Sequence, residues 1–176
     1  NQIQVNNKAG LTFASALRSI LRADPDIVLI GEIRDRETAM ISIEAALTGH
    51  LVLSTLRTND APSAMTRLTE MEVETFLVAS AVDCVIAQRL ARKVCGDCKQ
   101  RIEIPKEALE EAGMPEAMIP TVTAFKGIGC RTCSQTGYKG RIALYEVMPL
   151  KEELKELVLT GASSSELKNE SIRLGM

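Results

Sequence analysis

Short continuous apolar runs alternate with segments of helical periodicity along the first third of the chain. The runs 27–30 and 50–55 have the length and composition of strands that are buried on both faces. Residues 13–21 place their apolar side chains on one helical face behind an N-cap at Thr12, and residues 36–47 are apolar on most sides. This alternation of strands and helices predicts an α/β layer fold with a parallel sheet.

The helical pattern continues after the second strand. Asn59 or Asp60 is placed to cap a helix that carries Pro62 in its first turn. Apolar side chains then recur at four-residue steps, which favours one long helix over residues 75–94. The residues at these steps are Val78, Val82, Ile86, Leu90 and Val94. Residues 1–94 are therefore expected to form one domain.

The character of the chain changes at Cys95. The next fifty residues are rich in turns and are punctuated by Gly and Pro, with short helices expected at 106–112 and 115–118. This region lacks the long periodic segments of the preceding part. We therefore expect a second module over residues 95–146.

The two ends of the chain differ. Two amphipathic helices are expected near 151–159 and 164–174, the second capped by Ser163 or Ser164, and they form a helical segment over residues 147–176. At the other end, residues 1–6 alternate like a strand already under way, and there is no initiator Met. The chain is accordingly interpreted as a fragment.

Composition narrows the class of protein. Of the 176 residues, 45% are hydrophobic and only 3% aromatic, so the core must be aliphatic. The 21 basic and 23 acidic residues nearly balance, which gives no whole-protein field for binding nucleic acid or an anionic membrane. No segment resembles a signal peptide, and no apolar run approaches the roughly 18 residues of a membrane span. We therefore expect a soluble cytoplasmic protein.

Four of the five cysteines form two Cys-x-x-Cys pairs, Cys95 with Cys98 and Cys130 with Cys133. Two such pairs fit a tetrahedral zinc ion, which would be structural because no coordination position stays open for water. Two disulfides or a redox pair are the alternatives, but a cytoplasmic chain disfavours the first and redox chemistry needs only one pair. Cys84, expected on the long helix, is interpreted as an inert core or edge thiol.

An acidic residue follows the first apolar run. Glu32 stands at the carboxyl end of the expected strand 27–30, where open α/β sheets bind their ligands. In nucleotide-hydrolysing proteins a carboxylate at this place holds the magnesium ion that the phosphates share. The pattern alone is weak, because many buried strands end near an acid, and His50 and the arginines of the first helix have equally ordinary structural explanations.

Several motifs in order along nearly the whole chain resemble the secretion ATPase superfamily of type II secretion and type IV pilus assembly. The pairs of cysteines resemble the assembly and secretion branches, since the pilus retraction ATPases lack them. The motifs are Leu11-Thr12-Phe13, Arg22-Ala23-Asp24-Pro25-Asp26-Ile27-Val28-Leu29-Ile30-Gly31-Glu32-Ile33-Arg34-Asp35, Thr48-Gly49-His50-Leu51-Val52-Leu53-Ser54-Thr55-Leu56, Thr58-Asn59-Asp60-Ala61-Pro62, Ala87-Gln88-Arg89-Leu90 and Gly137-Tyr138-Lys139-Gly140-Arg141.

The resemblance implies the fold and the activity of the parent protein. The fold would be the second half of a RecA-like P-loop ATPase core, followed by the four-cysteine zinc module and a C-terminal helical tail. The parent would be a homo-hexameric ATPase that uses ATP and magnesium at the cytoplasmic face of a bacterial inner membrane. Its motion would drive a membrane platform protein that adds pilin-like subunits, with no direct binding of nucleic acid.

Site residues carry over from the same motifs. Glu32 corresponds to the Walker B carboxylate that is associated with magnesium, and His50 belongs to the histidine box near the phosphates. Arginines are the candidates for contacts with phosphate or with a neighbouring subunit. They are Arg18, Arg22, Arg34 and Arg67.

The chain departs from the family pattern in two ways. It contains no Gly-x-x-x-x-Gly-Lys-Ser/Thr sequence, and in this family that loop and the catalytic glutamate lie before the present start. The fragment alone is therefore expected not to hydrolyse ATP. In addition, Arg57 stands where the histidine box has its second histidine; its guanidinium could contact a γ-phosphate but could not titrate.

Two other functions remain as alternatives. The chain could be a zinc-stabilised docking module that engages a membrane platform protein and does no chemistry itself. It could also be a nucleic-acid-binding zinc module connected with DNA uptake, although it lacks a basic surface and the aromatic residues that stack on bases.

Overall fold

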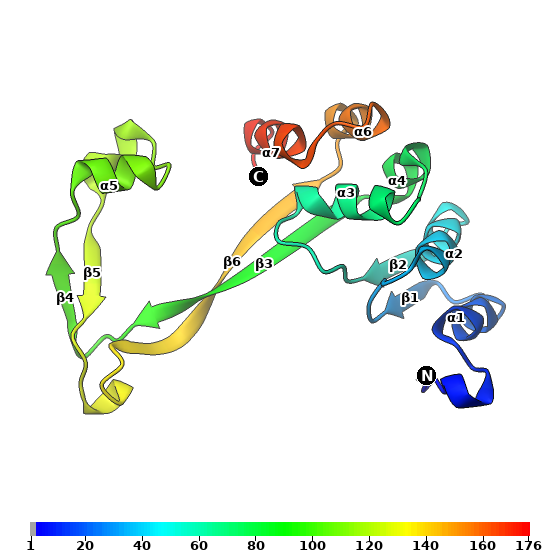
Figure 1. Ribbon diagram of the computed structural model, residues 1–176, viewed down its shortest axis with the longest axis horizontal. Helices are drawn as coiled ribbons and strands as arrows, with labels where there is room; N and C mark the ends of the chain where they lie inside the picture. The colour runs from blue at the N-terminus through cyan, green and yellow to red at the C-terminus, as the bar shows by residue number, and fades with distance from the viewer. Residues whose placement is uncertain (1–2) are drawn as a thin grey trace. The chain divides into compact units, whose positions relative to one another are not determined.

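The computed structural model describes residues 3–176 (Figure 1). The chain divides into two compact units. The first comprises Asn1–Gln88 and Tyr145–Met176, and the second comprises Arg89–Leu144. These units differ in their bounds from the three expected domains, because the last 32 residues pack with the first 88.

The first unit begins with the expected succession of strands and helices. Thr12 caps α1 by accepting a hydrogen bond from the Ser15 amide at 3.2 Å, as predicted. The expected helices 13–21 and 36–47 and the expected strands 27–30 and 50–55 are confirmed within a residue at each end, and a helix carries Pro62 in its first turn as expected. The elements are η1 (Asn7–Ala9), α1 (Phe13–Leu21), β1 (Ile27–Ile30), α2 (Arg36–Leu47), β2 (Leu51–Ser54), α3 (Pro62–Glu70) and α4 (Thr75–Ala81).

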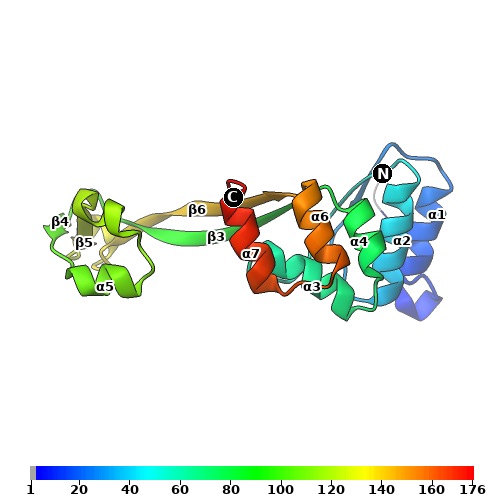
Figure 2. The same cartoon turned by 90° about the horizontal axis from the view of Figure 1, so that it is seen from above.

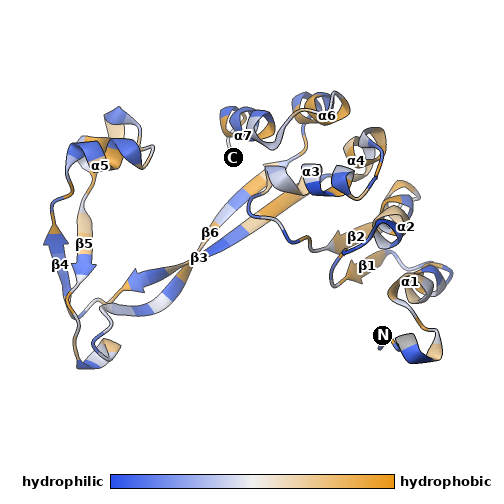
Figure 3. Ribbon diagram, in the orientation of Figure 1, coloured by the Kyte–Doolittle hydropathy of each residue, from blue (hydrophilic) through white to orange (hydrophobic). Residues whose placement is uncertain are grey.

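Strands β1 and β2 form a two-stranded parallel sheet, which confirms the predicted strand direction. Ile27 pairs with Leu51, and Ile30 pairs with Ser54. Both strands are hydrophobic except at Ser54 (Figure 3), but they are not buried on both faces as expected, because Ile27, Leu29, Leu51 and Leu53 are exposed. One face of β1 packs on α1 and α2 through Val28 and Ile30.

The helices of this unit enclose the main apolar core. Helix α2 contacts α1 and α4, and α4 contacts α6 (Glu152–Leu159), which in turn contacts α7 (Ser164–Arg173) (Figure 2). Ser163 and Glu166 form a reciprocal capping box at the start of α7, as the sequence predicts. The largest fully buried side chains of the core include Met148, Leu154 and Leu167.

The long helix expected over residues 75–94 is wrong. The helix ends at Ala81, and residues 84–94 form strand β3 (Cys84–Val94), which pairs with β6 (Tyr138–Pro149). Apolar residues at four-residue steps share one face of a helix, but they also share one face of a strand, because four is a multiple of the strand period of two. Ile86 and Leu90, which the helical interpretation places inside, are exposed.

The expected strand over residues 1–6 is also not formed where the structure describes it. Residues 3–5 have no regular secondary structure, and Asn6 makes a single antiparallel bridge with Leu11. Residues 1 and 2 lie outside the described part of the chain. Alternating polarity alone does not make a strand, because a strand needs a partner for its backbone groups.

The second unit is built from short elements. Strands β4 and β5 pair antiparallel, with Lys99 opposite Gly127 and Ile102 opposite Ala124. The two short helices expected here are confirmed, the second as a 3-10 helix. The elements are β4 (Lys99–Ile102), α5 (Lys106–Glu111), η2 (Glu116–Thr121), β5 (Ala124–Gly127) and η3 (Arg131–Cys133).

Candidate functional site

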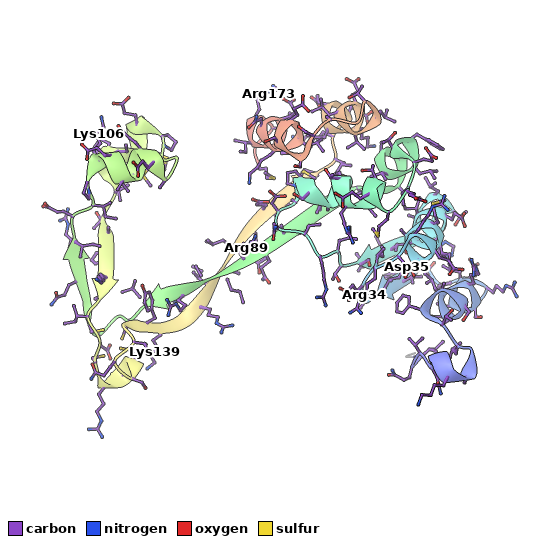
Figure 4. All side chains as sticks on the ribbon, in the orientation of Figure 1. Arg34, Asp35, Arg89, Lys106, Lys139 and Arg173 are labelled. Carbon is purple, nitrogen blue, oxygen red and sulfur yellow. The ribbon has the colours of Figure 1, made fainter. Side chains whose placement is uncertain are left out.

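The carboxyl ends of β1 and β2 are fixed to each other. The Ile33 amide donates a hydrogen bond to the Thr55 carbonyl at 3.0 Å, and the Thr55 hydroxyl donates to the Gly31 carbonyl at 2.7 Å. Because the strands are parallel, the segments that follow them leave the sheet at the same edge. Glu32 and Arg57 are therefore carried on neighbouring loops (Figure 4 labels Arg34 and Asp35 at this edge).

Two arginines hold the Glu32 carboxylate. Arg57 Nε lies 2.5 Å from Oε1, and Arg34 Nε lies 2.5 Å from Oε2. The hydrogen bond from Arg34 and then that from Arg57 lower the pKa of Glu32 below its usual 4.5. The Glu32 side chain is 20% exposed, whereas those of Arg34 and Arg57 are 70% and 83% exposed. An ionised carboxylate thus sits beneath two guanidinium groups that face solvent.

These groups line a cavity of about 300 Å³. Its lining residues are Glu32, Ile33, Arg34, Arg57 and Arg67. Arg67 extends from α3 and also pairs with Glu70, with Nη1 and Oε2 3.1 Å apart. Three guanidinium groups and one carboxylate give the lining an excess of positive charge, so the cavity suits an anion with several oxygens.

Three other residues of the expected site lie elsewhere. Arg18 pairs with Glu37 on α2 at 2.8 Å, and Arg22 is the C-cap residue of α1. His50 precedes β2 and therefore lies at the opposite edge of the sheet from Glu32, on the order of 15 Å away at 3.3 Å per residue. Its Nδ1 lies 3.0 Å from the Ala45 carbonyl oxygen. The structure does not bring His50 to the arginine-lined cavity.

A larger cavity of about 710 Å³ lies between β2 and the first part of β3. Its lining is mainly aliphatic, and it includes His50 and Asp83. The buried Nε2 of His50 has no hydrogen-bond partner among the described residues. Among the described residues this lining includes the Cys84 thiol but no lysine or arginine to bind a phosphate, so the smaller cavity is the candidate site.

A network fixes the start of α3, the helix that carries Arg67; the sequence indicated Asp60 at this helix start, but it did not indicate Glu146 or Lys168. Asp60 accepts a hydrogen bond from the Ser63 amide at 3.0 Å, and Glu146 Oε2 accepts one from the Ala61 amide at 2.9 Å. Lys168 Nζ lies 3.5 Å from Asp60 Oδ2 and 3.7 Å from Glu146 Oε1. The loop after β2 is thereby tied to β6 and α7.

The second unit brings the four expected cysteines together. The Sγ atoms of Cys95, Cys98, Cys130 and Cys133 all lie within 4.8 Å of one another, and all five cysteines of the chain are free thiols. The separations are 3.9 Å for Cys95 and Cys130, 3.9 Å for Cys98 and Cys133, and 3.7 Å for Cys130 and Cys133. This group could hold one metal ion. Cys84 lies apart from it and is exposed on β3 rather than on a helix.

Backbone amides and burial act on these thiols in opposite directions. Burial disfavours the thiolate of Cys133, but the amides of Cys130 and Gly137, each 3.2 Å from its Sγ, outweigh this and lower its pKa to about 6. Burial raises the pKa of Cys98 to about 12. Gly137 can pack closely against Gly127 because Gly127 has no Cβ. A Cβ at Gly127 would lie only 2.0 Å from the Gly137 carbonyl oxygen.

The motifs of this site match known proteins. The sequence pattern that defines the family Type II/IV secretion system protein covers residues 1–174. The chain belongs to this family. Among its secretion relatives, the type IV pilus assembly ATPase PilB of Myxococcus xanthus is 56% identical over 177 residues, which cover 100% of this chain and 31% of that protein. PilB of Thermus thermophilus is 51% identical over a match that covers 100% of this chain and 20% of that protein.

The relatives also include proteins of type II secretion. The type II secretion system protein HxcR of Pseudomonas aeruginosa is 47% identical, over 100% of this chain and 34% of that protein. The chain therefore spans about a third or less of the length of these relatives. Relatives of this family are ATPases of pilus assembly and proteins of type II secretion, as the sequence motifs indicated.

Solved structures show the same α/β fold. The pilus retraction motor PilT with bound ADP has a TM-score of 0.60 at 24% identity, over 93% of this chain and 36% of that one. The ATPase DotB of Yersinia pseudotuberculosis has a TM-score of 0.62 at 21% identity, over 93% of this chain and 34% of that one. None of the described helices is long and apolar enough to cross a membrane.

Proposed function

We propose that this chain is the part of a secretion or pilus assembly ATPase that supplies the magnesium-associated carboxylate and several phosphate-binding arginines. The parent would work as a homo-hexamer at the cytoplasmic face of a bacterial inner membrane, where it drives a platform protein. The observation that carries the proposal is the ionised Glu32 in a cavity lined by three arginines at the carboxyl edge of a parallel sheet. The membership of the family supports it.

The residues present fit magnesium bound together with phosphates. Mg²⁺ is usually held by one or two carboxylates and by substrate oxygens, and it neutralises charge on the transferred phosphoryl group. Glu32 offers one carboxylate that stays ionised because its pKa is lowered. Arg34, Arg57 and Arg67 would contact phosphate oxygens, and the hydrogen bonds of Thr55 would hold the two loops in register.

We also propose that the four-cysteine group binds a structural zinc ion. A tetrahedral site with Zn–S bonds of about 2.3 Å has S–S edges of about 3.8 Å. The three short separations in the group are 3.7–3.9 Å, so little movement is needed to close the site. With four protein ligands the metal would stabilise the fold and would take no part in hydrolysis.

The test exchanges the matching segment of Myxococcus xanthus PilB for these 176 residues. The chimera is expected to hydrolyse ATP with magnesium. Glu32→Gln should lower the rate on the order of a hundredfold, as the loss of one group that stabilises transition-state charge does. Glu44→Gln, an exposed change on α2, is the matched control and should leave the rate unchanged. Full activity of the Glu32→Gln chimera would overturn the proposal.

The isolated chain gives a second readout. Because the 176 residues contain no Gly-x-x-x-x-Gly-Lys-Ser/Thr loop, purified chain is expected to show no magnesium-dependent hydrolysis of ATP. A steady release of phosphate that Glu32→Gln abolishes would show that these residues suffice for turnover. In that case the division of the active site proposed here would be wrong.

A docking role is the second candidate. It is favoured by the compactness of residues 89–144, which form a unit of their own with their own strands β4 and β5. Such a unit could engage a platform protein whether or not the remainder hydrolyses ATP. Binding of the purified 89–144 unit to inner-membrane platform proteins, lost on removal of the metal, would support this role.

A further inference from the structure

Arg57 and the cation proposed to bind Glu32 compete for the same oxygen. The Nε of Arg57 lies 2.5 Å from Glu32 Oε1, and Arg34 takes the other oxygen, Oε2. Both carboxylate oxygens are therefore engaged by guanidinium groups. A divalent cation needs at least one of them, and its positive charge is repelled by the arginines that hold them. In this structure the two arginines therefore keep a divalent cation from the Glu32 carboxylate.

Arg34 and Arg57 differ in how they contact the Glu32 carboxylate. Arg34 follows Glu32 by two residues on the same loop, and it contacts the carboxylate through both Nε and Nη2. Arg57 reaches the carboxylate from the loop after β2, and its side chain is 83% exposed. An exposed ion pair is weak, because water and salt screen it, so Arg57 can exchange its partner readily.

An oxyanion in the neighbouring cavity would offer Arg57 a second partner. Arg57, Arg34 and Arg67 line one cavity of about 300 Å³, in which a tetrahedral oxyanion could contact more than one guanidinium group. An anion that draws Arg57 away from Glu32 also adds negative charge beside the carboxylate. Both changes favour a divalent cation at Glu32.

We propose that Arg57 is an anion-operated gate on Glu32. Without an oxyanion it holds the carboxylate and excludes the cation; with a phosphoryl-type oxyanion in the cavity it turns to the anion and frees Oε1. Cation and oxyanion then bind with positive coupling, and by linkage each raises the affinity for the other. This inference rests on the proposed function of Glu32, and it assigns a regulatory role to the residue that stands in the second histidine position.

The test uses the purified 176-residue chain with Mn²⁺ as the cation and sulfate as the oxyanion. Binding is followed by the paramagnetic broadening of the backbone amides of Gly31 and Ile33, which report on Glu32 and not on distant acids. Arg57→Gln is expected to tighten Mn²⁺ binding by roughly threefold, the factor that corresponds to one exposed ion pair. Sulfate is expected to tighten Mn²⁺ binding to the parent chain, with chloride at the same ionic strength as the reference.

Matched variants separate the gate from a general charge effect. Arg173→Gln also removes an exposed arginine bonded to a glutamate, Glu170, in the same unit (Figure 4), and it should leave broadening at Gly31 unchanged. Arg57→Lys keeps the charge and should retain the sulfate effect, whereas Arg57→Gln should lose most of it. Amide spectra of each variant show whether it is folded.

The outcomes are distinct. If Arg57→Gln binds Mn²⁺ no more tightly than the parent chain, or if sulfate weakens Mn²⁺ binding, the gate is refuted while hydrolysis by the PilB chimera still supports the proposed function. If Mn²⁺ fails to broaden these amides even when Arg34 and Arg57 are both changed to Gln, Glu32 is not a cation ligand in this chain, and both the gate and the role proposed for Glu32 fall together.

Discussion

The two compact units reach an ordered structure by different means. The unit of residues 1–88 and 145–176 buries a large aliphatic core around Val78, Met148 and Leu154. In residues 89–144 the buried side chains among those described are only Cys95, Cys98 and Cys133. A unit of this size without an apolar core usually depends on a metal or on disulfides. The four clustered cysteines could hold a metal ion there, and the proposed zinc would take the place of the hydrophobic burial that the smaller unit lacks.

The two units also differ in the sign of their formal charge. Residues 89–144 contain ten basic and six acidic residues, a formal charge of +4, whereas the remainder contains eleven basic and seventeen acidic residues, −6. A zinc ion with four thiolates would carry a net charge of −2, which the surplus of four basic residues would more than offset. Basic neighbours also favour the thiolate form that binds metal.

The largest effect should follow from removing a cysteine ligand. Cys98→Ser is expected to abolish tight zinc binding and to unfold residues 89–144, because zinc contributes about 10–16 kcal/mol in small zinc-dependent folds. Residues 1–88 and 145–176 should stay folded, since their core does not include the site. Elemental analysis and amide exchange of each unit would measure this. Cys84→Ser, at an exposed thiol, is the control. Retention of structure by both units without metal would contradict the comparison.

The apolar unit should respond instead to truncation of its core. Leu154 is 2% exposed on α6, and Leu154→Ala is expected to lower the free energy of unfolding of this unit by about 2–5 kcal/mol. Leu29 is 76% exposed on β1, so Leu29→Ala should change it by less than about 0.5 kcal/mol. Urea unfolding followed separately for each unit measures both. Equal losses for the two leucines would show that the exposed face of β1 is covered in solution.

A smaller effect is expected where the start of α3 is fixed. Glu146→Ala leaves the buried amide of Ala61 without its acceptor, and the expected cost is about 1–2 kcal/mol. Glu146→Gln keeps an oxygen acceptor at the same position and should recover most of the loss. The same urea experiment reports the difference. If alanine and glutamine cost the same, the charge contact with Lys168 is the important one, and the hydrogen bond to Ala61 is not.

Local sequence signals predicted the local parts of this structure. Thr12, Ser163 and the paired cysteines act within a few residues of themselves, so their spacing carries the information. The same logic places Glu32 at the carboxyl edge of the sheet. The structure places His50 at the opposite edge, because a residue that precedes a parallel strand cannot lie beside one that follows its neighbour, whereas the resemblance to the histidine box implied a place near the phosphates.

The parts that the sequence did not predict depend on distant partners. Strand β3 is a strand because it pairs with β6, about fifty residues later, and nothing in its own four-residue spacing excludes a helix. Glu146 contacts Ala61 across 85 residues, and Lys168 completes the network from the last helix. Such contacts leave no periodic signal along the chain, so they become visible only in the folded unit.

The smallest expected effect concerns acidification of the Glu32 site. Hydrogen bonds from Arg34 and Arg57 lower the pKa of Glu32 below 4.5, so its ion pairs favour the folded state at neutral pH. This contribution is fully present above pH 4.5 and is lost as the pH falls through the lower pKa of the folded protein. Titration of the Glu32 side-chain carboxyl carbon by NMR should give a midpoint below 4.5, and Arg57→Gln should move the midpoint upward. A midpoint of Glu32 that is unchanged in Arg57→Gln would mean that Arg34 alone holds the carboxylate, and the contrast between the two arginines would not stand.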